Sequence, residues 1–267
     1  MSTDAVIATA ALTRRYDELV AVDALDLEVR RGLIFGLLGP NGAGKTTTLK
    51  MLTTLLPPTS GTALVAGFEV AAQPREVRRR IGYVPQLVSA DGGLTARENL
   101  VLSARLYRLP GKERRERIAA ALEFMGLAPA ADQLVRTYSG GMIRRLELAQ
   151  AMLHRPTVLF LDEPTTGLDP LARRAVWERL QELRGRWGTT VLITTHDMEE
   201  ADVLCDELAL MHQGRLAARG TPAELKARIG PEATLDDVFA KVAGGTIEAG
   251  GSYRDVSRAR RVARRLG

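Results

Sequence analysis

The alternation of apolar and polar positions along the chain predicts an α/β domain. The run at 158–161 contains only apolar residues, which is typical of a strand buried on both faces of a parallel sheet. Further candidate strands lie at 34–38 and 190–195. Helical patterns separate these runs, and strands that alternate with helices favour a doubly wound, mostly parallel sheet.

The remaining elements follow from hydrophobic periodicity and from residues that start or stop helices. Further strands are predicted at 6–12, 25–29, 62–65, 81–84 and 207–211. Helices are predicted at 45–55, 95–108, 112–124, 139–153, 170–186, 198–204, 222–229 and 235–242. Because no strand signal occurs at about 95–125, we expect a helical insertion at about 87–153 within the α/β domain.

The pattern changes near residue 221, where two short helices replace the alternation of strands and helices. Glycine pairs at 244–245 and 250–251 indicate a flexible linker. We therefore expect a main domain at 1–220, a small helical extension at 221–243 and a flexible basic tail at 244–267.

Composition excludes several classes of protein. Hydrophobic residues make up 45% of the chain, enough for a sizeable core, but no apolar run reaches the roughly 18–20 residues that cross a bilayer. The N-terminus lacks the pattern of a secretory signal, and a single cysteine, Cys205, fits a reducing compartment. We therefore expect a cytosolic protein that reaches a membrane through a partner.

The net charge of +5 does not indicate a nucleic-acid partner. Six arginines lie at 246–267 against Glu248 and Asp255, so the tail carries about +4 and the rest of the chain about +1. Aromatic residues, which stack on single strands, make up only 4%. For the tail itself we weigh two interpretations, contact with anionic lipid and a solvated disordered end, and favour the second.

The glycine-rich segment at 39–46 is the strongest chemical signal. It reads Gly-Pro-Asn-Gly-Ala-Gly-Lys-Thr between a predicted strand and a predicted helix. Glycines let backbone N–H groups close around phosphates at the positive end of the helix. In this pattern the lysine reaches the outer phosphates and the threonine hydroxyl binds Mg²⁺. The predicted ligand contacts are Gly39, Asn41, Gly42, Gly44, Lys45, Thr46 and Thr47.

An acidic pair follows the buried run at 158–161. Asp162 and Glu163 are placed at the carboxyl end of that strand, and open α/β sheets bind ligands at this edge. One carboxylate can hold Mg²⁺, usually through water, while its neighbour polarises an attacking water. The alternative is an acidic pair that only caps a turn. The phosphate loop upstream favours the metal and water role over this alternative.

Four further candidates are ambiguous in isolation. Ser139-Gly140-Gly141 opens a predicted helix, so it is either a second anion nest or an ordinary cap. His196 follows a strand and could donate a hydrogen bond to a phosphate, but a structural histidine is the alternative. Asp169 alone indicates a helix cap, and Gln86 alone indicates nothing specific. Two nests would serve one nucleotide only if a partner subunit supplied the second.

Taken in order, these segments resemble the ATP-binding subunit of ABC transporters. The phosphate loop at 39–46 is followed by a Gln loop at Gln86, a signature at 139–141, an acidic strand at 158–163, an Asp loop at Asp169 and a switch histidine at His196. The resemblance covers about residues 4–220. It implies an ABC-type phosphate-loop fold with an antiparallel N-terminal β subdomain.

The resemblance also implies roles for single residues. Glu163 is the implied general base, His196 braces the γ-phosphate of ATP, and Gln86 senses Mg²⁺ or the attacking water. Tyr16 lies where the family has an aromatic residue that stacks on adenine, and Asp162 holds Mg²⁺.

The resemblance implies the partners as well. Two copies pair head to tail, so that Ser139, Gly140 and Gly141 touch the partner's nucleotide. The helical insertion contacts an integral membrane permease, which places the subunit on the cytoplasmic face of the cell membrane as a peripheral protein. ATP and Mg²⁺ are the implied cofactors.

Two residues of the signature differ from the usual family pattern and indicate a subgroup of the family. Tyr138 and Met142 replace the outer residues of the usual Leu-Ser-Gly-Gly-Gln signature, a variant that resembles the ATPases of daunorubicin-resistance-type drug exporters. We therefore expect an ATPase that powers export of a drug-like molecule, lipid or glycan through a separate permease. The alternatives are an importer ATPase and a soluble ABC ATPase of repair or translation. Lys45 and Ser139 lie 94 positions apart, too close for the long coiled coil of repair members.

Overall fold

The structure, a computed structural model, describes residues 4–244. Its strands are β1 Ala5–Tyr16, β2 Leu19–Arg30, β3 Ile34–Leu38, β4 Ser60–Val65, β5 Phe68–Glu69, β6 Ile81–Val84, β7 Val158–Asp162, β8 Thr190–Thr195, β9 Glu207–His212 and β10 Arg215–Gly220. Its helices are α1 Lys45–Leu52, α2 Pro74–Arg80, α3 Ala96–Leu106, α4 Gly111–Phe124, α5 Gly140–Met152, α6 Pro170–Trp187, α7 Met198–Leu204, α8 Pro222–Ala227 and α9 Leu235–Gly244, with 3₁₀ turns η1 Ala128–Ala130 and η2 Val135–Thr137.

A central sheet of six strands in the order β10-β9-β3-β8-β7-β6 organises the described part of the chain. From β9 to β6 the neighbouring strands are parallel, and β10 adds an antiparallel edge. A second sheet, in the order β2-β1-β4-β5, is antiparallel. The predicted α/β fold, with a parallel core sheet and an antiparallel N-terminal β subdomain, is therefore confirmed.

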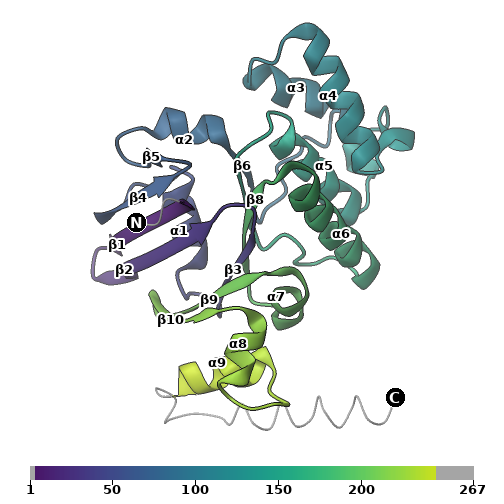
Figure 1. Cartoon of the computed structure of the whole chain (residues 1–267). Helices are drawn as coiled ribbons and strands as arrows, with labels where there is room; N and C mark the ends of the chain where they lie inside the picture. Colours follow the sequence, from purple (N-terminus) through teal and green to yellow (C-terminus); the bar gives the residue numbers. More distant parts are fainter. Residues whose placement is uncertain (1–3, 245–267) are drawn as a thin grey trace, which may run out of the picture.

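Two hydrophobic clusters cover the two faces of the central sheet. In β7, Val158 and Phe160 belong to the cluster shared with the N-terminal sheet and α1, whereas Leu159 and Leu161 belong to the cluster shared with α3 to α7. Successive side chains of a strand point to opposite faces, so the unbroken apolar run fills both clusters. In Figure 1 the N-terminal sheet (purple) lies on one side of the central sheet and the helical insertion (teal) on the other.

The C-terminal helices α8 and α9 lie below the edge of the central sheet in Figure 1 (yellow). Leu225 of α8 and Leu235 and Val238 of α9 are buried in the same cluster as the helical insertion. None of the described helices combines the length and apolarity that crossing a bilayer requires. The tail predicted at 244–267 lies outside the described residues, except for Gly244.

Several predicted boundaries were wrong. The strands predicted at 6–12 and 25–29 each have 12 residues, because a tight turn pairs Tyr16 with Leu19 and continues the hairpin through polar positions. The first helix ends at Leu52 rather than residue 55, because Thr54 adopts a left-handed φ of 64° that breaks helical geometry.

Besides the two 3₁₀ turns, two strands and one α-helix of the described residues were not predicted. Strand β5 has only two residues, and α2 reads PREVRRR with a single buried residue, Val77. Strand β10 lies at a sheet edge and is at most half-buried, so its hydrophobic alternation is weak. Each of these elements depends on a neighbouring strand or sheet rather than on a pattern of its own.

Candidate functional site

The carboxyl ends of four adjacent strands bring the predicted residues together. Strands β3, β8, β7 and β6 are neighbours and run parallel. The phosphate loop follows β3, and His196 follows β8. Asp162 ends β7 with Glu163 directly after it, and Gln86 lies shortly after β6. Parallel strands end at one edge of a sheet, so residues that are far apart in sequence meet there.

The phosphate loop has the backbone geometry that its glycines predict. Gly42 and Gly44 adopt φ values of 82° and 99°, which other residues rarely reach. A side chain on Gly39 would clash with the carbonyl oxygen of Met211 on β9, so this position also requires glycine. Helix α1 begins at Lys45, directly after Gly44, and its first N–H groups therefore face the loop.

Lys45 is held in the middle of the site. Its ammonium group donates to the carbonyl oxygens of Gly39 and Pro40 at 2.8 and 3.1 Å and lies 3.7 Å from the carboxylate of Glu163. Burial lowers the pKa of Lys45, and the carboxylates of Glu163 and Asp162 partly offset that effect. A buried cation with carbonyl and carboxylate neighbours is well placed to meet a phosphate.

Thr46 and Asp162 form an oxygen pair beside the lysine. The Thr46 hydroxyl donates to Asp162 Oδ1 at 3.0 Å, and the hydroxyl of Thr194 donates to the same oxygen at 2.5 Å. Asp162 is only 2% exposed. Hydroxyl and carboxylate oxygens are the ligands that Mg²⁺ prefers, together with phosphate oxygens and waters, so the donor set fits this ion.

Glu163 is the point at which the other candidates converge. The Gln86 amide donates to Glu163 Oε2 at 3.1 Å, and His196 Nδ1 lies 3.1 Å from Oε1. The Thr166 hydroxyl donates to Oε2 at 3.2 Å. Glu163 itself adopts a left-handed φ of 47°, a conformation that costs a non-glycine residue roughly 1–3 kcal/mol and that clusters at functional sites.

The second nest lies at the start of α5. The Ser139 hydroxyl accepts from the N–H of Met142 at 3.3 Å, which makes it the N-cap of the helix. Ser139 and Gly140 are exposed. A side chain on Gly141 would lie 2.7 Å from the Cβ of Ala172 on α6, so glycine is needed for close helix packing as well.

The remaining predicted residues lie outside the cluster at Glu163. Asp169 caps α6 by accepting from two N–H groups of its first turn. Tyr16 ends β1, is 41% exposed, and has the guanidinium carbon of Arg14 4.6 Å from its ring centroid. Asn41 is exposed, and Thr47 is half-buried in α1. Within the described residues, no hydrogen bond joins Ser139 to the phosphate loop.

Sequence reasoning missed Thr194 and Thr166. Thr194 is a strand residue that lies opposite Asp162 in the pairing of β7 with β8, and it also accepts from the N–H of Glu163 through its hydroxyl at 3.1 Å. Its only sequence signal is a polar residue near the end of a buried strand. The register between the two strands gives that residue its partner.

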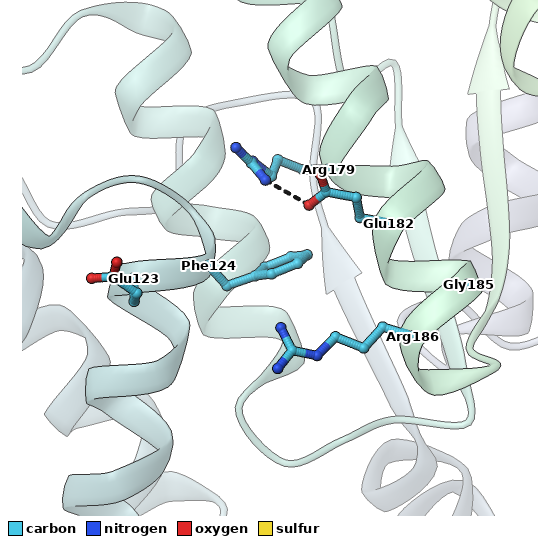
Figure 2. A pocket seen from close by; sticks show the side chains of 6 residues that line it. All are labelled: Glu123, Phe124, Arg179, Glu182, Gly185 and Arg186. Atoms are coloured by element: carbon cyan, nitrogen blue, oxygen red, sulfur yellow. Dashed lines mark hydrogen bonds and ion pairs between the residues drawn. The ribbon is translucent and has the colours of Figure 1, made fainter.

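A shallow hollow of about 550 Å³ between α4 and α6 contains none of the predicted residues. Figure 2 shows Phe124 projecting between Arg179 and Arg186, whose guanidinium carbons lie 5.6 and 6.0 Å from its ring centroid. These contacts attach the end of α4 to α6, and they do not point to a nucleotide.

A glycine phosphate loop after β3 and an acidic pair at the end of β7, a parallel strand of the same sheet, define a phosphate-loop nucleotide triphosphatase. A family model described as "ABC transporter" matches residues 22–166. The chain is 50% identical to the daunorubicin/doxorubicin resistance ATP-binding protein DrrA of Streptomyces peucetius, over 84% of this chain and 68% of the relative. It is 48% identical to a Nod factor export ATP-binding protein of Ralstonia nicotianae, over 82% of this chain and 68% of the relative.

Solved structures agree with the sequence relatives. An ATP-binding subunit of an ABC transporter superimposes with a TM-score of 0.79 at 30% identity, covering 89% of this chain and 99% of that chain. A dimeric ATP-binding cassette bound to ADP and Pi gives 0.72 at 26% identity, over 80% and 98%. The chain belongs to the ABC transporter family, as an ATP-binding subunit that hydrolyses ATP to power export.

Proposed function

We propose that two copies of this subunit close head to tail over two ATP molecules, each held between one phosphate loop and the other copy's Ser139–Gly141 nest. The exposed start of α5 at Ser139 and Gly140 supports the pairing. The catalytic assignment rests on Glu163, because Lys45, Gln86 and His196 all lie against its carboxylate. Glu163 then acts as the general base for the attacking water, and His196 supports the γ-phosphate. The dimeric neighbour supports the pairing.

The proposed cofactor contacts are the residues that the sequence motifs predict. Gly39, Asn41, Gly42, Gly44, Lys45, Thr46 and Thr47 hold the phosphates, and Tyr16 stacks on the adenine. Asp169 lies at the interface of the two copies. Thr46, Asp162 and Gln86 hold Mg²⁺ directly or through water, and the ion supplies positive charge that stabilises the transferring phosphoryl group.

The metal assignment has a direct test. Thr46→Val keeps the shape of the side chain but removes the oxygen, so ATP hydrolysis should need a higher Mg²⁺ concentration to reach half its maximal rate. Thr46→Ser restores the hydroxyl and is the matched control. An unchanged Mg²⁺ requirement in Thr46→Val would remove Thr46 from the metal site.

A surface on the helical side is the proposed contact with a membrane permease. Leu87 and Val88 follow Gln86 directly and are 80% and 62% exposed. Leu102 and Leu106, one turn apart on α3, are 50% and 74% exposed. Exposed apolar side chains of this kind mark interaction sites, and the position beside Gln86 would connect permease movement to the nucleotide. The subunit would lie on the cytoplasmic face of the membrane.

The docking proposal can be tested in membranes that contain the permease. Leu87→Ser with Val88→Ser should release the subunit from those membranes. Leu19→Ser, which alters a residue of the N-terminal hairpin that is 65% exposed, should not. Equal retention of both variants would contradict the assignment.

The cargo and the division of the chain also belong to this proposal. One relative is named for daunorubicin/doxorubicin resistance and another for Nod factor export, so the names of similar subunits refer to different molecules. We propose a drug-like, lipid or glycan cargo, chosen by the permease. The ATP-binding domain is 1–220, the helical extension 221–243 and the tail 244–267.

A further inference from the structure

A buried ion pair lies in the second turn of α5, close to the Ser139 nest. Arg144 and Glu147 are one turn apart, 3.0 Å from each other, and are 6% and 3% exposed. Among the ion pairs of the described residues, only this one and Lys45–Glu163 have both side chains less than a tenth exposed. Burial lowers the pKa of Arg144, while Glu147 counteracts the effect.

Within the described residues, the other side-chain hydrogen bonds of this pair all go to the loop that follows β6. Arg144 donates to the carbonyl oxygens of Pro85 and Gln86 at 2.8 and 3.2 Å. Glu147 Oε1 accepts from the backbone N–H and the hydroxyl of Ser89 at 2.5 and 2.9 Å. The two side chains therefore hold both ends of the segment 85–89, which has the exposed residues Leu87 and Val88 between them.

The segment held in this way carries Gln86, whose amide contacts Glu163. A continuous series of contacts thus runs from Ser139 along α5, through Arg144 and Glu147, to Gln86 and Glu163. Buried ion pairs add little to stability, because desolvation cancels much of the attraction, and apolar residues of similar size often replace them without loss. A role in holding the loop explains the pair better than a role in folding.

We propose that Arg144 and Glu147 are positioning residues that hold Gln86 against Glu163 and make this loop follow α5. A nucleotide of the partner that moves the Ser139 nest would then also move Gln86 in this chain's own site. The inference rests on the proposed roles of Ser139, Gln86 and Glu163, and it assigns to the pair the coupling between the two sites of the dimer.

The test replaces both charges with apolar residues of similar size. Arg144→Met with Glu147→Leu leaves no unpaired buried charge, so the subunit should stay folded with an ATP affinity within about threefold of the original. Hydrogen exchange at 86–91 should accelerate, because the N–H of Ser89 loses its acceptor. We expect kcat to fall by about tenfold to a hundredfold, with KM little changed, because the loop no longer fixes Gln86.

The matched control is Arg179→Met with Glu182→Leu. That pair has the same order and spacing on α6, but its side chains are 31% and 51% exposed, and neither contacts the nucleotide site. This control should leave kcat and the exchange at 86–91 unchanged. Arg144→Lys is a milder variant that keeps the charge, but one ammonium group cannot reproduce the fork, so kcat should fall by less than in the double variant.

The outcomes separate this inference from the proposal on which it rests. If Gln86→Ala is impaired while the folded Arg144/Glu147 double variant has normal kcat and normal exchange at 86–91, the positioning role is wrong. If Gln86→Ala itself hydrolyses ATP normally, the proposed role of Gln86 fails instead. Should the double variant not fold, Arg144→Lys with wild-type kcat and exchange would overturn the inference.

Discussion

The chain contains two anion nests at helix starts, and their surroundings differ sharply. The phosphate loop before α1 faces the chain's own carboxylates, with Lys45 3.7 Å from Glu163 and Thr46 3.0 Å from Asp162. Among the described residues, Ser139 forms no hydrogen bond with a carboxylate: it caps its own helix, and both Ser139 and Gly140 are exposed.

On the proposed account, one nest is part of a complete chemical site and the other supplies half of a site that two copies share. Helix starts bind anions in either setting. Hydrolysis also needs a general base, a metal site and a cationic side chain that contacts the phosphate. Only the phosphate loop has these within its own chain. The second nest becomes functional, on this account, when another copy brings a nucleotide to it.

Of the substitutions that test this difference between the two nests, Glu163→Gln should reduce ATP hydrolysis most. The amide cannot accept a proton, so kcat for ATP should fall by about 10²–10⁴-fold, which is the usual contribution of a general base. ATP affinity should change by no more than a few-fold, since the phosphate loop remains. Steady-state hydrolysis at the wild-type rate would exclude Glu163 as the base.

Lys45→Ala should weaken the complete nest itself. Removing a charged donor to phosphate costs about 1.5–3 kcal/mol, so ATP should bind the isolated subunit about tenfold to a hundredfold more weakly. Equilibrium binding of a fluorescent ATP analogue measures this directly. An unchanged dissociation constant would contradict the phosphate-loop assignment.

Ser139→Ala should separate the two nests. ATP binding to the monomer should be unchanged, whereas hydrolysis that depends on pairing should fall by about tenfold, equivalent to one lost hydrogen bond of roughly 1.4 kcal/mol. The substitution also removes a helix cap, worth about 1 kcal/mol of stability.

Thr221→Ala controls for that loss, because it removes the cap of α8, far from the nest. If Ser139→Ala and Thr221→Ala reduced hydrolysis equally, Ser139 would act through stability alone.

His154 should have the smallest effect on hydrolysis and a measurable one on stability. Its ring stacks on Tyr107 at 3.6 Å, Nε2 lies 2.9 Å from the carbonyl oxygen of Ile81, and burial lowers its pKa to about 4. The unfolded chain binds the proton near pH 6.5, so the free energy of unfolding should fall by about 2–3 kcal/mol as pH drops from 6.5 to 4.

His154→Phe keeps the stacking and removes the titration. Chemical denaturation at pH 7 and pH 4.5 should therefore show a smaller pH-dependent loss for the variant than for the original protein. Identical pH dependence would mean that His154 does not remain neutral in the folded state.

The sequence predicted the elements that have patterns of their own. The run at 158–161 revealed β7 because both faces of the strand are buried, and the boundaries of β8 and α7 matched at both ends. Strand β10 could not be predicted, because its exposed and half-buried residues show no clear alternation and its extended conformation depends on pairing with β9.

Some residues of the candidate site could also be predicted from local sequence, and others could not. The glycine spacing at 39–46 predicts its chemistry locally, whereas Gln86 and His196 were ambiguous until the order of segments suggested a family. Thr194 and the Arg144–Glu147 pair escaped notice because their partners are set by strand register and helix packing. Residue spacing along the chain does not record those relationships.

The oligomeric state of Glu163→Gln with ATP and Mg²⁺ tests the central claim most directly. Light scattering coupled to size exclusion should show a dimer with ATP and Mg²⁺ and a monomer without nucleotide, and adding Ser139→Ala should shift the equilibrium toward the monomer. A Glu163→Gln subunit that binds ATP but stays monomeric, even with its permease present, would contradict the shared nucleotide site.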